Sequence, residues 1–247
     1  MRNLWTLTVR EWKAFWYSPI AYVVGTAFLF LQGWVFWFLV SILNDPRVDP
    51  SINISHLFFG TMWYWFSIVM MAPLLTMRSF SEEKRTGTIE VLLAAPVTDV
   101  QVVASKFLGA WLSYCMLWAM TVVYFVLVSR TTTLDWGPVG AGYLCTALLG
   151  GVFISLGVFA SSTTRNQVVA GFISFVLILL LFSISLLGIF MRDPQATKTI
   201  QYLSMLDHVR DFSRGIFDTR PIVFYLSVIT AALFLTVRAV GNPRWRA

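Results

Sequence analysis

Six long apolar segments constrain this chain more than any other feature of its sequence. They cover residues 20–43, 57–77, 102–128, 138–160, 168–191 and 221–240. Each is long enough to cross the hydrocarbon core of a bilayer, which takes roughly 20 residues of helix. Backbone groups in lipid must bond within the protein, and these runs lack the alternation of barrel strands. We therefore expect one all-α membrane domain over residues 1–247, with six transmembrane helices.

The composition agrees with residence in a lipid bilayer. Of the 247 residues, 57% are hydrophobic and only 12% are charged. The N-terminus, residues 78–106, the turn at 161–167 and the C-terminus together hold eleven of the eighteen lysines and arginines, and all of the net charge of +6. Positive loops favour the cytoplasmic side. We expect a multi-pass membrane protein with both termini in the cytoplasm, and no nucleic-acid partner.

Residues 1–18 predict an amphipathic helix that lies in the membrane interface. Its tryptophans suit the headgroup boundary and its basic residues suit an anionic leaflet. Glu11 falls within the apolar arc of this helix. Two readings are open for it: an ion pair with a nearby lysine or arginine, or contact with a partner subunit.

A polar stretch over residues 78–101 interrupts the apolar pattern on the positive side and predicts a cytoplasmic elbow between the second and third spans. Phe80–Arg85 can form a short charged helix, Gly87 can end it, and a second short helix can run to Pro96. Thr98 with Gln101 three residues later is typical of a capping box, so the third span is predicted to begin there.

Two other polar segments connect spans. Residues 192–220 have helical spacing of apolar side chains and predict one or two amphipathic helices on the extracytoplasmic surface, where His208 is expected to be a surface hydrogen-bonding residue. The turn at 161–167 is either a plain solvated turn or a minor second contact with a partner. That contact would be made by Arg165, Asn166 and Gln167.

Several chemistries are missing from the sequence. No predicted span centre contains Asp, Glu, Lys, Arg or His, which argues against a proton-coupled transporter. There is no G-x-x-x-x-G-K-[ST] loop, so the chain does not bind ATP in the usual way. Cys115 and Cys145 lie inside predicted spans and suggest neither a disulfide framework nor a zinc site. We expect no cofactor, no metal and no enzymatic activity in this chain itself.

The elbow resembles the first cytoplasmic loop of type-2 ABC permeases, the membrane subunits of ATP-driven exporters. That loop carries a charged cluster, then Gly-Thr-hydrophobic-Glu, then Leu-Leu and Pro. The resemblance implies that the residues facing an ATPase subunit are Ser81, Glu82, Glu83, Lys84, Arg85, Thr86, Gly87, Thr88, Glu90 and Pro96. The segments Arg10–Val24, Ser162–Gly171 and Tyr202–Asp218 are similar to the gliding-motility-associated branch of these permeases.

The resemblance implies a permease of a bacterial inner membrane. It pairs with a second copy of itself or a related chain, above two ATPase subunits that bind ATP and Mg²⁺. An auxiliary membrane subunit with a periplasmic domain is a further expected partner. Two other functions stay open. One is a membrane anchor or assembly subunit of a motility or envelope machine that transports nothing. The other is a passive channel, against which the absence of charged rings or a filter motif counts.

Overall fold

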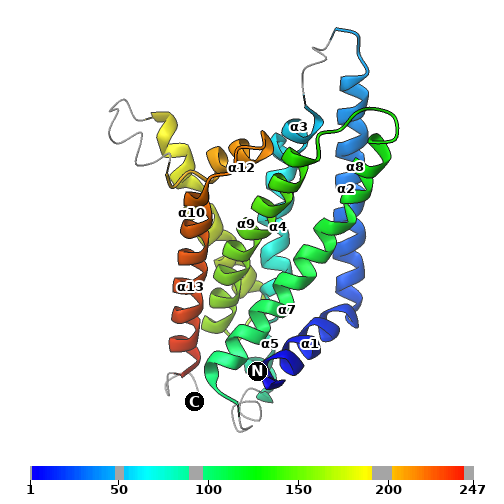
Figure 1. Ribbon diagram of the computed structural model, residues 1–247. Coiled ribbons are helices and arrows are strands. Elements are labelled where there is room, and N and C mark those ends of the chain that lie inside the picture. Colours follow the sequence, from blue (N-terminus) through cyan, green and yellow to red (C-terminus); the bar gives the residue numbers. More distant parts are fainter. Residues whose placement is uncertain (1, 48–52, 89–96, 191–201, 242–247) are drawn as a thin grey trace.

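The computed structural model describes residues 2–47, 53–88, 97–190 and 202–241, and within them every regular element is an α-helix. Figure 1 shows their arrangement. The helices are α1 (Arg2–Trp16), α2 (Pro19–Leu43), α3 (Ile54–Gly60), α4 (Met62–Thr76), α5 (Ser81–Thr86), α7 (Asp99–Met120), α8 (Val122–Val128), α9 (Trp136–Thr163), α10 (Gln167–Phe190), α12 (Met205–Ser213) and α13 (Thr219–Gly241).

Five stretches in the described residues are long and apolar enough to cross a membrane. They are α2, the stretch formed by α7 and α8, α9, α10 and α13. A sixth span results if α3 is counted together with the helical stretch Met62–Thr86, although the chain bends by 50° between them. The expected all-helical membrane fold is therefore confirmed, with five to six candidate spans.

The second span differs from the single helix expected over residues 57–77. It begins earlier, at Ile54, and it breaks at Thr61. The Thr61 hydroxyl donates to the carbonyl of Phe58 and accepts from the backbone N–H of Tyr64, 3.2 Å away. The side chain thus caps α4 where a continuous helix would have used backbone bonds.

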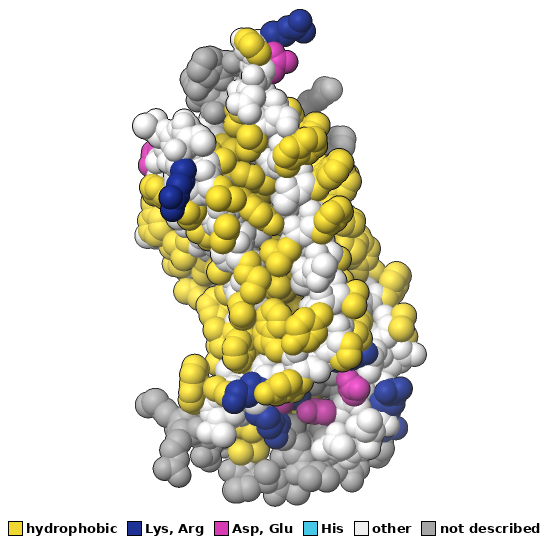
Figure 2. Space-filling view, turned by 90° about the vertical axis from the view of Figure 1, so that its right-hand side faces the viewer, with side chains coloured by type: hydrophobic (Ala, Val, Ile, Leu, Met, Phe, Trp, Pro, Cys, Tyr) yellow, Lys and Arg dark blue, Asp and Glu magenta, His cyan; other side chains and the backbone are white. Residues whose placement is uncertain are grey.

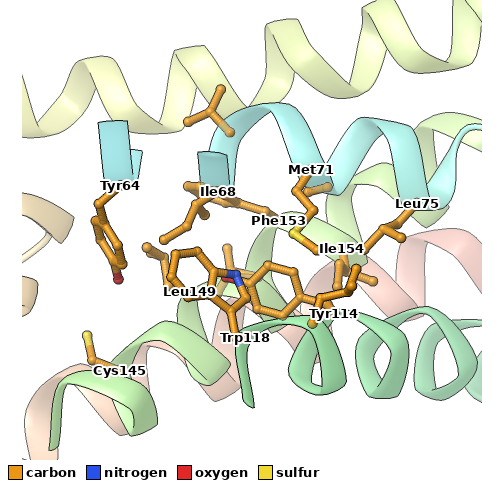
Figure 3. Packing of buried hydrophobic residues seen from close by; sticks show 14 of the residues in the cluster. Tyr64, Ile68, Met71, Leu75, Tyr114, Trp118, Cys145, Leu149, Phe153 and Ile154 are labelled. Carbon is orange, nitrogen blue, oxygen red and sulfur yellow. The ribbon is translucent and has the colours of Figure 1, made fainter. Parts of the chain in front are cut away.

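Helix α9 forms the centre of the bundle. Of the most apolar 18 residues of this helix, 72% are buried within the protein, against 17–33% for the same length of the other four candidate spans. Figure 3 shows Leu149, Phe153 and Ile154 of α9 packed with side chains of α4 and α7. A Cβ at Gly150 would come within 2.1 Å of the Tyr114 ring, so this close approach requires glycine. This glycine-rich helix therefore packs deep in the bundle.

The two ends of the bundle carry different elements. In Figure 1 both termini, α1 and α5 lie at one end, while α3 and α12 lie at the other. In Figure 2 hydrophobic side chains cover the middle of the visible face and charged side chains gather toward the two ends. Helix α2 carries exposed aromatic residues, among them Phe30, Trp34 and Trp37. Such an apolar belt is typical of a surface that faces lipid.

One expectation for the 192–220 segment is wrong. His208 is not a surface residue but is 6% exposed, and its Nδ1 lies 3.1 Å from the Tyr225 hydroxyl of α13. The side chain is buried because α12 packs its apolar face, including Met205 and Phe212, onto the bundle. Residues 191–201 lie outside the described ranges, so the rest of the predicted helical structure in this segment stays a prediction.

Candidate functional site

The candidate site is α5 and the residues around it, at the end of the bundle that carries the termini. Glu82 and Glu83 occupy its first turn, and Lys84 and Arg85 its last, which suits the helix macrodipole. Gly87 follows with φ of 74°, a left-handed conformation that ends the helix. Both features agree with the sequence prediction.

The backbone of α5 is bound to the carboxyl end of α9. The Ser161 hydroxyl accepts from the N–H groups of Phe80 and Ser81, at 3.0 and 3.1 Å, and itself donates to the carbonyl of Met77 at 3.3 Å. The Lys84 ammonium donates to the carbonyl of Ser162. Three connections therefore join α5 to α9, so the two elements move together unless these bonds break.

A buried ion-pair cluster joins α5 to two further helices. Lys106 of α7 has a side chain only 2% exposed, and its Nζ lies 2.6 Å from Glu83 Oε1 and 3.3 Å from Glu11 Oε2. The same ammonium lies 5.2 Å from the centre of the Phe80 ring. We call Glu11, Glu83 and Lys106 the Lys106 cluster. It links α1, α5 and α7 through one cation.

The geometry of α1 against α7 explains why Glu11 reaches this lysine. A Cβ at Gly109 would come within 2.9 Å of the Glu11 Cβ, so the helices cross closely at that glycine. Burial alone would raise the pKa of Glu11, but the charges of Lys106 and of Arg10, whose guanidinium is 2.9 Å away, outweigh it and lower the pKa. Glu11 is therefore held as a carboxylate by partners within the chain, as the first of its two readings expects.

The start of α7 places Lys106 in the cluster. The predicted capping box is present: the Thr98 hydroxyl accepts from Gln101 N–H at 3.3 Å, and the Gln101 side chain accepts from Thr98 N–H at 3.2 Å. Because the cap fixes where α7 begins, it also fixes that Lys106 lies in the second turn, level with α5.

The predicted coupling residues divide into three groups. Ser81 and Lys84 are buried and Glu83 is turned to Lys106, so these three contact the bundle. Glu82 is half-buried, and the residues that are exposed are Arg85, Thr86, Gly87 and Thr88. Glu90 and Pro96 lie outside the described residues. The coupling role of all ten stays a prediction.

The turn at 161–167 lies beside α5 through its bonds from Ser161 and Ser162. Arg165 and Asn166 are exposed and Gln167 is half-buried. The Asn166 side chain accepts from Val168 N–H at 2.9 Å and so caps the start of α10. The two surfaces expected to meet a partner are thus adjacent, which the sequence alone did not indicate.

Sequence reasoning missed Lys106 and Ser161 as members of this site. A signal existed for Lys106, because a lysine five residues inside the predicted third span needs a carboxylate or a water path. Ser161 gave no comparable signal, since serine is common in buried membrane helices. Among the described residues no group of His, Cys, Asp and Glu could hold a metal ion, and Cys115 and Cys145 are free thiols.

The chain matches a known protein family. A family model described as an ABC-2 family transporter protein matches residues 17–240. No curated protein matches the chain. The matched range includes α5 and every candidate span except the last residue of α13, and it begins directly after α1.

Proposed function

The chain belongs to the ABC-2 family of transporter proteins, and from this premise we propose that it is an exporter permease driven by separate ATPase subunits. A membrane permease of an ABC transporter works with an ABC ATPase, which binds ATP and Mg²⁺. In this proposal two ATPases dock beneath two permease chains, either two copies of this one or one copy with a related chain. The export direction and the coupling to ATP hydrolysis belong to the proposal.

The attachment of α5 to the bundle is the observation that supports coupling. A force applied to the exposed side of α5 would reach α9 through Ser161 and Lys84, and α1 and α7 through the Lys106 cluster. Helix α9 is a candidate span, α7 is part of one, and α1 directly precedes the candidate span α2. A charged helix with this many anchors transmits displacement, where a loosely attached loop would absorb it.

The proposal includes an orientation. The end that carries both termini and α5 faces the cytoplasm of a bacterial inner membrane, and α12 faces the opposite side. Helix α1 lies in the interface, where its exposed Trp5 meets the headgroup region. The finer resemblance, to the gliding-motility-associated branch with an auxiliary subunit, remains a prediction.

The test of this function needs variants that change the outer side of α5 without touching its anchors. Reversing both Glu82 and Glu83 does not meet that need, because a lysine at position 83 would face Lys106. We choose Arg85→Glu, with Arg130→Glu as the matched control. Arg130 is also exposed but follows α8 at the other end of the bundle.

The assay co-purifies the permease with its ATPase and measures ATP hydrolysis in proteoliposomes. We expect Arg85→Glu to weaken association by about tenfold or more, as removal of a charge pair at an interface does, while Arg130→Glu binds normally. Normal association and normal hydrolysis in Arg85→Glu would exclude coupling through this helix. Normal binding of the ATPase to a permease that shows no transport activity would favour the anchor or assembly function.

A further inference from the structure

A cavity of about 290 Å³ lies where α1, α4, α5 and α7 meet. Its charged lining residues are Glu11, Arg78, Glu82, Glu83 and Lys106, and part of its remaining wall is formed by Phe15, Ile20 and Leu74. Its size is close to the lower limit for small-molecule pockets. The cavity is therefore large enough for a small ligand and has both a charged side and an apolar side.

The helices themselves set the level of this cavity relative to the membrane. Ile20 is in the first turn of α2, Leu75 is in the last turn of α4, and Lys106 is in the second turn of α7. Candidate spans thus begin or end at this level, which is where lipid headgroups lie. Leu74, which lines the cavity, is 41% exposed on the outside of the bundle, so the cavity reaches the surface beside α4.

Two of the charged groups are left without a partner. Lys106 is neutralised by Glu11 and Glu83, but Arg78 and Glu82 form no ion pair with any residue that the structure describes. The Arg78 Nε is a buried donor and the Glu83 Oε2 a buried acceptor, and neither has a hydrogen-bond partner among the described residues. Buried polar groups without partners are uncommon and cost free energy.

The charged and polar groups without partners specify the chemistry of the ligand. A guanidinium requires an anion, and carboxylate oxygens require a cation that donates hydrogen bonds. Water can bond to these atoms but supplies no countercharge. One molecule that carries both charges a few atoms apart, at headgroup level, satisfies both.

We propose that this cavity binds the zwitterionic headgroup of an aminophospholipid of the phosphatidylethanolamine type. The phosphate contacts Arg78, the primary ammonium contacts Glu82 and the free oxygen of Glu83, and the glycerol and first acyl carbons lie against Phe15, Ile20 and Leu74. The lipid then connects Arg78, which lies between α4 and α5, to α5 itself. The inference depends on membrane residence and not on ATP coupling.

The test is native mass spectrometry of the full-length chain, released from detergent with lipid added. The three lipids are phosphatidylethanolamine, phosphatidylglycerol, which has the phosphate but no cation, and phosphatidylcholine, whose quaternary nitrogen has no N–H. We expect one phosphatidylethanolamine per chain, bound about tenfold or more tightly than the other two, which is the size of one charge-assisted hydrogen bond. Equal binding of the three lipids would overturn the proposal.

Variants assign the contacts. Arg78→Gln should reduce binding of phosphatidylethanolamine by about tenfold or more, while Arg78→Lys, which keeps the charge, should retain most of it. Glu82→Gln should remove the preference over phosphatidylglycerol. Arg85→Gln is the control, since Arg85 does not line the cavity. Unchanged binding in Arg78→Gln would overturn the assignment, and thermal unfolding of each variant separates lost binding from lost structure.

A competition experiment distinguishes binding of a lipid from binding of a free phosphodiester. Soluble glycerophosphoethanolamine carries the same headgroup without acyl chains. We expect it to compete only weakly, because the apolar wall contributes to binding of the lipid. Competition as strong as that of the lipid would overturn the assignment of a membrane lipid.

Discussion

Replacing Lys106 by methionine is the sharpest test of how α5 is held to the bundle. Lys106 is the single cation between Glu11 and Glu83, and these carboxylates come from two other helices. Methionine keeps the apolar stem of the side chain and removes the charge. The substitution therefore leaves packing nearly intact and places two carboxylates next to each other with no lysine between them.

The expected loss of stability can be estimated from burial. Removing one partner of a buried ion pair costs about 3–5 kcal/mol, because the remaining charge is left uncompensated. The side chains of Glu11 and Glu83 are 20% and 22% exposed, so water reaches them in part and the low end applies, about 3 kcal/mol. At about 2–4 °C per kcal/mol for a chain of this size, Tm should fall by about 6–12 °C.

The measurement is thermal unfolding in detergent, followed by tryptophan fluorescence. Lys13→Met is the matched control, because Lys13 is exposed on α1 and forms no ion pair within the described chain; its Tm should stay within about 1 °C. Adding Glu83→Gln to Lys106→Met should recover part of the loss, because it removes one uncompensated carboxylate. A Tm of Lys106→Met equal to that of the control would refute the reasoning that this cluster holds α5 in place.

Two further predictions concern the core and the opposite end of the bundle. Gly150→Ala should destabilise the protein by about 1–3 kcal/mol, because its methyl group would overlap the Tyr114 ring. The methyl group of Gly140→Ala, on the same helix, meets nothing within 4 Å, so that variant should be neutral or slightly stabilising. Equal Tm values for the two variants would contradict this prediction. Burial lowers the pKa of His208, and the carboxylates of Asp207 and Asp211 offset only part of that effect. The unfolded chain therefore binds the proton first, near pH 6.5, and stability that is complete above this pH should decrease as the pH falls toward the folded-state pKa. Tm measured between about pH 7.5 and 5.5 should drop less in His208→Gln than in the wild type, and identical slopes would count against a buried neutral imidazole.

Local features of the fold were predictable from the sequence because neighbouring residues decide them. The capping box of Thr98 with Gln101 and the left-handed Gly87 depend on contacts within four residues, and both are present. The candidate spans follow from hydrophobicity over about 20 residues. The sequence therefore predicts best those features whose determining interactions join residues that are close together along the chain.

The features that sequence reasoning missed depend on contacts between distant segments. Lys106 meets Glu11 across 95 positions, and Ser161 meets Phe80 across 81. His208 was expected at the surface, but α12 packs it against Tyr225 of α13. A helical pattern predicts which residues share a face, and it does not predict what covers that face.

The charged run of α5 shows how helix geometry settles a question that composition leaves open. Consecutive residues of a helix are about 100° apart, so the four charges from Glu82 to Arg85 cannot all face one partner. Lys84 lies on the same side as the buried Ser81 and contacts α9, Glu82 lines the cavity together with Glu83, and Arg85 and Thr86 are exposed on the outer side. Charges one residue apart therefore serve different surfaces. Because the outer side and the anchors lie within one turn of the same short helix, a partner that moves Arg85 must also strain the bonds of Lys84 and Glu83 to the bundle.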